Sequence, residues 1–129
     1  MVGVEVLVFR DKKVLLGKRA NKKNPGWALP GGRWKIGETV EECAARELWE
    51  ETGMRAAGFK VIGAVNGVYP DGERFFVVYT KAMRPTGEPM VKEIYCSEWK
   101  WFNVHSLPKP LFLTVKTFLK QKTLEEMSK

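Results

Sequence analysis

Three glutamates occupy the side of a predicted helix that hydrophobic residues would be expected to fill. An apolar stripe begins at Val40 and Cys43, and helical spacing continues it to Glu47, Glu50 and Glu51. Glu47 and Glu51 stand at i and i+4, where like charges repel by roughly 0.2–0.5 kcal/mol even when exposed. Two interpretations are open: a solvated acidic face, as in most glutamate runs on helices, or a cluster that binds a cation.

The residues around these glutamates follow a longer fixed pattern between positions 32 and 54. Written from Gly32, the pattern is G-x5-E-x7-R-E-L-x-E-E-x-G-M. It matches the Nudix box position for position, and so many specified positions constrain a motif far more than a short glycine pattern does. The chain therefore resembles the Nudix hydrolases, which act on phosphoanhydride bonds.

Four further segments extend the resemblance over nearly the whole chain. They are LLGKR at 15–19, ALPGG at 28–32, EECAARE at 41–47 and SLPKPLF at 106–112. These segments are similar to the MutT-like nucleoside triphosphate pyrophosphohydrolases and to small eukaryotic Nudix enzymes that act on nucleotides and oxidised nucleotides. Arg33 departs from the likeness, since several of those enzymes carry His or Lys after the double glycine. The resemblance implies cleavage of nucleoside triphosphates, including oxidised or modified ones, to a monophosphate and pyrophosphate.

Such a reaction needs divalent cations, because water must approach a phosphorus that is already surrounded by negative oxygens. Mg²⁺ prefers oxygen ligands in octahedral geometry, which suits a cluster of carboxylates. The resemblance implies Mg²⁺ as the cofactor, with Mn²⁺ as an alternative. The implied ligands are Glu47, Glu50, Glu51 and the backbone carbonyl of Gly31.

Arg46 and Glu38 are expected in the catalytic site beside these ligands. Arg46 directly precedes the acidic cluster and follows Glu42 by four residues, so we expect it to tether neighbouring glutamates rather than to bind substrate. We expect Glu38 to hold the metal ligands in position without contacting the metal itself. Glu50 is one candidate for the general base.

Glu93, outside the box, is the second candidate base. Residues 88–99 repeat the spacing EPxxKExxxxEW of MutT, in which the second glutamate lies on a loop that faces the metals. The resemblance implies that Glu93 completes the metal ligands or takes the proton from the attacking water. The sequence does not decide between Glu50 and Glu93 as the base. The alternative for Glu93 is an ordinary loop charge. For Glu98, beside Trp99, we expect only a residue that borders the next strand.

Basic residues at the end of the second predicted strand are candidates for phosphate contact. By resemblance, Arg19 matches an arginine that contacts substrate phosphate in MutT-type enzymes. Lys18, Lys22 and Lys23 are equally well explained as solvated cations. Aromatic residues at strand spacing are more often core than base-stacking groups, and the candidates for either role are Trp27, Phe75, Tyr79 and Trp101.

Hydrophobic periodicity places these residues on a mixture of strands and helices. The predicted strands are residues 4–9, 14–16, 27–29, 59–65, 74–79 and 99–102. Thr39 with Glu42 predicts a capping box, Gly53 a C-cap, and residues 110–119 a second helix. We interpret Gly31 and Gly32 as a turn. The pattern is α+β, and the resemblance sharpens it to the Nudix fold, a mixed sheet between helices with a loop-helix-loop box at its edge.

Length and composition limit the chain to a single domain, residues 1–129. A hydrophobic fraction of 44% in 129 residues builds one core and not two. No apolar run approaches the ~18 residues of a membrane span, and residues 1–3 lead into a strand and not a signal peptide, so we expect a cytoplasmic protein without membrane partners. Cys43 and Cys96 lack metal-ligand spacing and are expected to be reduced thiols.

The net charge of +7 suits an anionic small substrate as well as nucleic acid. Without an aromatic RNA-binding signature, nucleic acid stays a minor hypothesis and a small-molecule nucleotide is the expected partner. Two other functions remain open. One is a Nudix enzyme for ADP-ribose or a dinucleoside polyphosphate, and the other is a non-catalytic module that binds nucleotides or RNA. Related small Nudix enzymes commonly form homodimers, so the resemblance also implies a homodimer.

Overall fold

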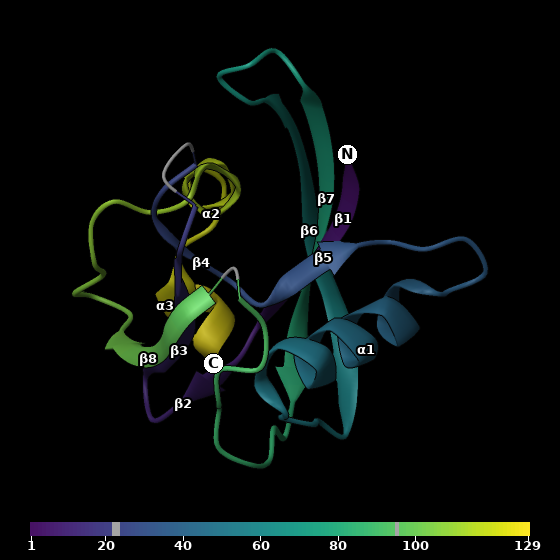
Figure 1. The fold of residues 1–129 in the computed structure, drawn as a ribbon. Coiled ribbons are helices and arrows are strands. Elements are labelled where there is room, and N and C mark those ends of the chain that lie inside the picture. The colour runs from purple at the N-terminus through teal and green to yellow at the C-terminus, as the bar shows by residue number, and fades with distance from the viewer. Residues whose placement is uncertain (22–23, 95) are drawn as a thin grey trace.

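The computed structural model describes residues 1–21, 24–94 and 96–129, whose strands form two sheets. The first sheet has the strand order β5-β1-β7-β6. Its strands are β1 (Val2–Leu7), β5 (Gly31–Arg33), β6 (Gly58–Val68) and β7 (Arg74–Met83). β1 and β7 run parallel, whereas β5 and β6 pair with them in the antiparallel sense, so the sheet is mixed. Figure 1 shows the far end of the β6–β7 hairpin projecting from the molecule.

The second sheet is built around β3, which pairs with three other strands. Its strands are β2 (Phe9–Arg10), β3 (Lys13–Arg19), β4 (Trp27–Ala28) and β8 (Cys96–Asn103). The predicted turn between β2 and β3 is confirmed, because Asp11 and Lys12 have φ angles of 49° and 63°. Positive φ at both positions matches the right-handed twist of the strands that such a tight hairpin joins.

Side-chain alternation gives each face of the first sheet its own helices. The helices are α1 (Val40–Thr52), α2 (Leu113–Phe118) and α3 (Leu124–Ser128). On one face, Val4 and Val6 pack in a core cluster with Leu48 of α1. On the other face, the rings of Tyr79 and Phe118 stack with centroids 3.9 Å apart. Figure 1 shows α1 on the opposite side of this sheet from α2 and α3, which confirms the predicted sheet between helices.

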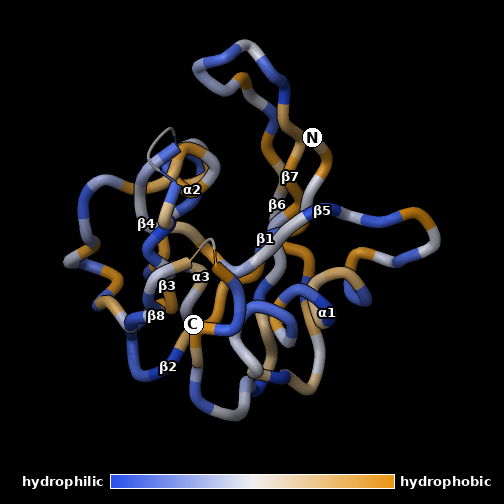
Figure 2. The backbone as a smooth tube through the Cα atoms, in the orientation of Figure 1, coloured by the Kyte–Doolittle hydropathy of each residue, from blue (hydrophilic) through white to orange (hydrophobic). Residues whose placement is uncertain are grey.

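Both ends of α1 are formed as predicted. The Glu42 N–H donates to the Thr39 hydroxyl at 3.0 Å, and the Thr39 N–H donates to the Glu42 carboxylate at 2.9 Å. At the other end, Gly53 has a left-handed φ of 75° and donates its N–H to Trp49. Figure 2 shows hydrophilic and hydrophobic residues alternating along α1, as an amphipathic helix requires.

The prediction of a turn at Gly31 and Gly32 was wrong, because both residues lie in β5. They pair with Glu5 and Val4 of β1. A Cβ atom on Gly31 would collide with the Val4 carbonyl oxygen, so glycine here allows the close approach of two backbones. Tertiary packing therefore explains these glycines better than turn geometry does.

The second predicted helix, residues 110–119, is also different in the structure. The Trp27 N–H donates to the Pro110 carbonyl at 2.9 Å, and the Phe112 N–H donates to the Trp27 carbonyl at 2.9 Å. These bonds hold the start of the segment extended beside β4, and α2 begins only at Leu113. The predicted strand 4–9 is likewise divided, with β1 in the first sheet and β2 in the second.

Two further features concern the cysteines and the helices of the described residues. Cys43 and Cys96 are free thiols. Within residues 1–21, 24–94 and 96–129, no helix combines the length and the apolar character that crossing a membrane requires.

Candidate active site

Arg46 stands at the centre of the acidic cluster and contacts three of its glutamates. Its Nε donates to Glu38 at 2.6 Å, while its Nη1 donates to Glu47 at 2.7 Å and to Glu50 at 3.2 Å. The Nη2 atom also donates to Glu38 and to the Arg33 carbonyl. These bonds lower the pKa of Glu38 to about 2 and raise the pKa of Arg46 further above its usual range. Arg46 therefore holds the guanidinium–carboxylate network in one arrangement.

Glu51 and Glu47 are buried although they carry ionisable groups. The Gly31 N–H donates to the Glu51 carboxylate at 2.7 Å. Burial raises the pKa of Glu51 to about 8, and the charges of Glu47 and Glu93 add to that rise. Burial likewise raises the pKa of Glu47, against the opposing contribution of Arg46. The folded protein therefore disfavours ionisation of these two carboxyl groups as long as no cation lies beside them.

Gly32 makes room for one of these carboxylates. A Cβ atom at this position would lie 2.6 Å from the Cδ atom of Glu47, closer than side chains can pack. A side chain at the first glycine of the box would therefore displace the Glu47 carboxylate of the helix that follows it. Together, Gly31 and Gly32 touch the carboxylates of Glu51 and Glu47, so β5 and α1 form one unit.

The donor set of this cluster fits a divalent cation. Glu47, Glu50 and Glu51 offer only oxygen atoms, and their mutual repulsion is what a bound cation would relieve. Among the described residues, no three acidic, histidine or cysteine side chains already converge as a metal site. In this arrangement Arg46 donates to an oxygen of Glu47 and of Glu50, and the Gly31 N–H donates to an oxygen of Glu51.

Glu93 lies half-buried in the loop between β7 and β8, close enough for its charge to raise the pKa of Glu47 and Glu51. The neighbouring Lys92 donates its Nζ to the Trp49 carbonyl at 3.0 Å and lies 4.3 Å from the Trp49 ring. The structure therefore brings Glu93 to the C-terminal half of α1. Glu98, by contrast, is exposed and lies within β8, which begins three residues before the predicted start at Trp99.

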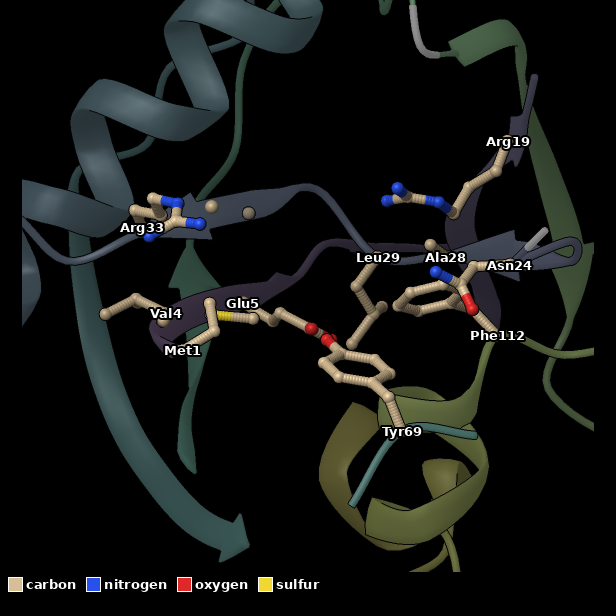
Figure 3. A pocket seen from close by; sticks show the side chains of 13 residues that line it. Met1, Val4, Glu5, Arg19, Asn24, Ala28, Leu29, Arg33, Tyr69 and Phe112 are labelled. Carbon is tan, nitrogen blue, oxygen red and sulfur yellow. The ribbon is translucent and has the colours of Figure 1, made fainter. Parts of the chain in front are cut away.

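A cavity of about 210 Å³ lies on the other side of the paired glycines. Figure 3 shows Arg19 and Glu5 on its walls, with the rings of Tyr69 and Phe112 beside them. The Arg19 guanidinium lies 4.4 Å from the Phe112 ring. The other residues that line the cavity are Met1, Gly3, Val4, Asn24, Ala28, Leu29, Gly31, Gly32 and Arg33. Among residues 1–21, 24–94 and 96–129, Arg19 is thus the one predicted substrate-contact residue that lines this cavity.

The aromatic candidates from the sequence lie elsewhere. Phe75 and Tyr79 are buried in the core, Trp27 packs edge-on against Phe102, and Arg10 covers the ring of Trp101 at 4.5 Å. None of the four candidates lines the cavity. Lys18 is exposed, in agreement with a solvated cation. Lys22 and Lys23 lie outside the described residues.

Sequence reasoning missed Glu5, Tyr69 and Phe112. Glu5 is only 9% exposed, and burial raises its pKa to about 7. The Thr114 hydroxyl donates to Glu5 Oε2 at 2.7 Å, whereas Glu5 Oε1 has no hydrogen-bond partner. An acidic residue inside the apolar run Val4 to Val8 was the available signal, because a buried carboxylate in a strand requires a reason.

Comparisons with known proteins agree with this architecture. The sequence model of the NUDIX domain family matches residues 1–122. The chain is similar to a Methanocaldococcus jannaschii protein called ADP-ribose pyrophosphatase, with 32% identity over 112 residues, which are 86% of this chain and 66% of that protein. It is also similar to a Bacillus subtilis protein called putative 8-oxo-dGTP diphosphatase, with 47% identity over 68 residues, 52% of this chain and 42% of that protein. The chain thus spans at most 66% of the length of these two relatives.

A solved structure matches over a larger share of its own length. The crystal structure of a MutT NUDIX hydrolase from Burkholderia pseudomallei superposes with a TM-score of 0.85 and 31% sequence identity. The match covers 95% of this chain and 97% of that one. Both the sequence pattern and the arrangement of the elements are therefore shared.

Proposed function

The chain belongs to the Nudix hydrolase family, and from that premise we propose that it is a Mg²⁺-dependent nucleoside triphosphate pyrophosphohydrolase. Its substrates would include oxidised or otherwise modified triphosphates, and its products would be a nucleoside monophosphate and pyrophosphate. One observation carries this proposal. The carboxylates of Glu47 and Glu51 contact the same two glycines, Gly31 and Gly32, that line the cavity on the other side. A charged phosphate chain and a base-sized group could therefore bind next to each other.

Glu47, Glu50 and Glu51 would hold the cation, with the Gly31 carbonyl and Glu93 as further ligands. When bound, the cation would screen the phosphate oxygens and lower the pKa of a water molecule. Arg46 would keep Glu47 and Glu50 in position, since it already binds both. Glu38 would in turn orient Arg46 through two hydrogen bonds.

Two residues are suited to take the proton from the attacking water. The Glu50 side chain is 43% exposed, so solvent water can reach it, although one of its oxygens accepts from Arg46. Glu93 is half-buried on a loop that lies against the end of α1. Arg19 would bind a phosphate group from the far wall of the cavity, which places positive charge opposite the acidic helix.

A substrate panel tests this proposal. The purified chain with Mg²⁺ would be offered canonical and oxidised triphosphates, ADP-ribose and dinucleoside polyphosphates, with separate detection of pyrophosphate, phosphate and nucleoside monophosphate. We expect the highest kcat/KM for a triphosphate and release of pyrophosphate. Much faster turnover of ADP-ribose than of every triphosphate would show that the substrate class is wrong.

The same panel covers the other two functions. ADP-ribose hydrolysis has support from the name of the Methanocaldococcus jannaschii relative, and its metal chemistry would use the same glutamates. A non-catalytic binding module would hydrolyse nothing while still binding nucleotides or RNA. The three buried or half-buried glutamates of α1 argue against such a module, because binding alone does not require mutually repelling carboxylates.

A further inference from the structure

Two buried polar atoms without partners belong to residues that line the cavity beside the acidic cluster. Oε1 of Glu5 and Nε of Arg19 are both buried and have no hydrogen-bond partner. Both residues line the same cavity, one from β1 and the other from the end of β3. Buried polar atoms in native proteins are nearly always satisfied, so two such atoms at one cavity indicate a missing ligand.

The Glu5 carboxylate is held so that only one oxygen remains available. Thr114 of α2 donates its hydroxyl to Oε2 at 2.7 Å. This hydrogen bond holds the Glu5 side chain through Oε2, and Oε1 is the oxygen left for a ligand. An ionised carboxylate accepts hydrogen bonds and donates none, so the ligand must present an N–H or O–H group.

The rest of the cavity limits what that ligand can be. Its volume of about 210 Å³ is below the range of ~300–1,000 Å³ for whole-ligand pockets, so it suits one part of a ligand. The rings of Tyr69 and Phe112 line it, and such rings favour a flat aromatic group. A phosphate would not lie against Glu5, since both would be negative, whereas Arg19 on another wall of the cavity can still contact one.

We propose that Glu5 determines base specificity, with Oε1 accepting a hydrogen bond from an exocyclic amino group of the substrate's purine. This inference rests on the proposed function, because it assumes a nucleotide whose phosphates lie at the acidic helix. A purine that lacks the amino group would leave Oε1 buried and unpaired. A hydrogen bond to a charged group is worth ~1.5–3 kcal/mol, which corresponds to about 10- to 150-fold in affinity.

Binding of nucleoside monophosphates tests the inference without requiring hydrolysis. Isothermal titration at pH 8 without divalent cation would compare two matched pairs of ligands. One pair is GMP and IMP, and the other is AMP and purine riboside monophosphate; each pair differs in one amino group. For the parent we expect the amino-bearing member of at least one pair to bind about 10- to 150-fold more tightly.

Two variants identify the residue responsible. Glu5→Met removes the acceptor at nearly constant volume and should reduce that ratio to below about twofold, well under the expected range. Thr114→Val removes the partner of Oε2 and leaves Oε1 in place, so it should lower the melting temperature and keep the ratio. A circular dichroism spectrum would verify that both variants fold.

Three outcomes would overturn the inference. They are equal affinities within both pairs in the parent, an unchanged ratio in Glu5→Met, or loss of the ratio in Thr114→Val alone. If Glu5 and Arg19 satisfied each other directly in solution, the first of these would be observed. Failure of the proposed function looks different, because the substrate panel would then show no triphosphate hydrolysis whatever the monophosphate affinities are.

Discussion

Arg46 forms ion pairs with three glutamates of the cluster and leaves Glu51 without one from its guanidinium. Its guanidinium binds Glu38, Glu47 and Glu50 within 2.6–3.2 Å. Glu51 has a backbone N–H as its partner instead, and its pKa is raised to about 8. We therefore expect Glu51 to gain most from a bound cation, because no cationic side chain of the described residues forms an ion pair with it.

Replacing Glu50 or Glu51 by glutamine should remove most of the hydrolytic activity and leave the fold intact. Either change deletes a carboxylate ligand, while a glutamine oxygen at position 51 can still accept the Gly31 N–H. Because repulsion within the cluster falls, the metal-free variants should be at least as stable as the parent. Initial rates with Mg²⁺ and thermal melting in a chelator check this. Full activity in either variant would refute it.

Glu38 should contribute stability that depends on pH. Hydrogen bonds from Arg46 lower its folded-state pKa to about 2, below the usual value of 4.5. The folded state therefore gives up the Glu38 proton more readily, so this stabilisation is present above pH 4.5 and disappears as pH falls towards 2. Glu38→Gln should be less stable than the parent at neutral pH, and the difference should shrink on acidification. Urea unfolding across this range measures it, and a gap that is constant with pH would contradict it.

Glu93→Gln should lower kcat by roughly 10²–10⁴-fold, the range for loss of a general base. Its charge already acts on Glu47 and Glu51, while the side chain is half-buried on a loop and contributes little to the core. Folding stability should therefore change little. Glu98→Gln is the matched control, because Glu98 is an exposed neighbour on β8 and should keep its activity. A loss below about threefold at saturating Mg²⁺, well under the expected range, would show that Glu93 is neither base nor essential ligand.

At the scale of elements, two contacts join the end of α1 to the loop that carries Glu93. One is made by Lys92, and in the other the Met90 N–H donates to the Thr52 carbonyl at 3.0 Å. The last turn of α1 contains no basic residue of its own. Lys92 supplies the missing cation from the loop, donating to the Trp49 carbonyl and lying over the Trp49 ring on which Arg55 also packs at 4.1 Å. At the other end of the loop, Arg10 binds Glu88 at 2.7 Å. The loop is thus attached at several points, and Glu93 directly follows the one at Lys92.

Lys92→Met should weaken this attachment without removing any catalytic group. A cation at a helix C-terminus is worth ~0.3–1 kcal/mol and an exposed cation–π pair ~0.5–1 kcal/mol, so we expect a stability loss of about 1 kcal/mol. The rate should fall less than in Glu93→Gln, because the carboxylate is still present but held less firmly. Lys60→Met on β6, whose side chain lines a different cavity, is the control. Equal rates in Lys92→Met and Lys60→Met would refute a positioning role.

At the scale of the whole molecule, the candidate site lies where the two sheets meet. The paired glycines lie in β5 of the first sheet, and the acidic helix packs against that sheet. Arg19 is the last residue of β3, which belongs to the second sheet. Phe112 reaches the cavity because the backbone before α2 pairs with Trp27 of β4. Both sheets and the connection to α2 must therefore be in place before a base-sized group can bind.

We predict that the protein is a homodimer, on the basis of its likeness to small Nudix enzymes. Multi-angle light scattering of the purified chain should give twice the 14.7 kDa of one chain. The mass should not change with dilution over the range in which the activity is assayed. A mass of one chain across that range would refute the prediction.

The helix that carries the glutamates could be predicted in detail from the sequence. Its apolar stripe, the capping box of Thr39 and Glu42 and the C-cap at Gly53 all depend on residues within one short stretch. Local hydrogen bonds and periodicity are sufficient for such an element, which is why its limits agree with the structure. The hairpin turn at Asp11 and Lys12 is local in the same way.

Tertiary structure decided the features that depend on distant residues. Gly31 and Gly32 look like a turn by composition, but their neighbours across the sheet and on α1 make them a strand. Glu5, Tyr69 and Phe112 converge on one cavity from three separate parts of the chain. No periodicity connects such positions, because the packing of both sheets and not the local conformation brings them together.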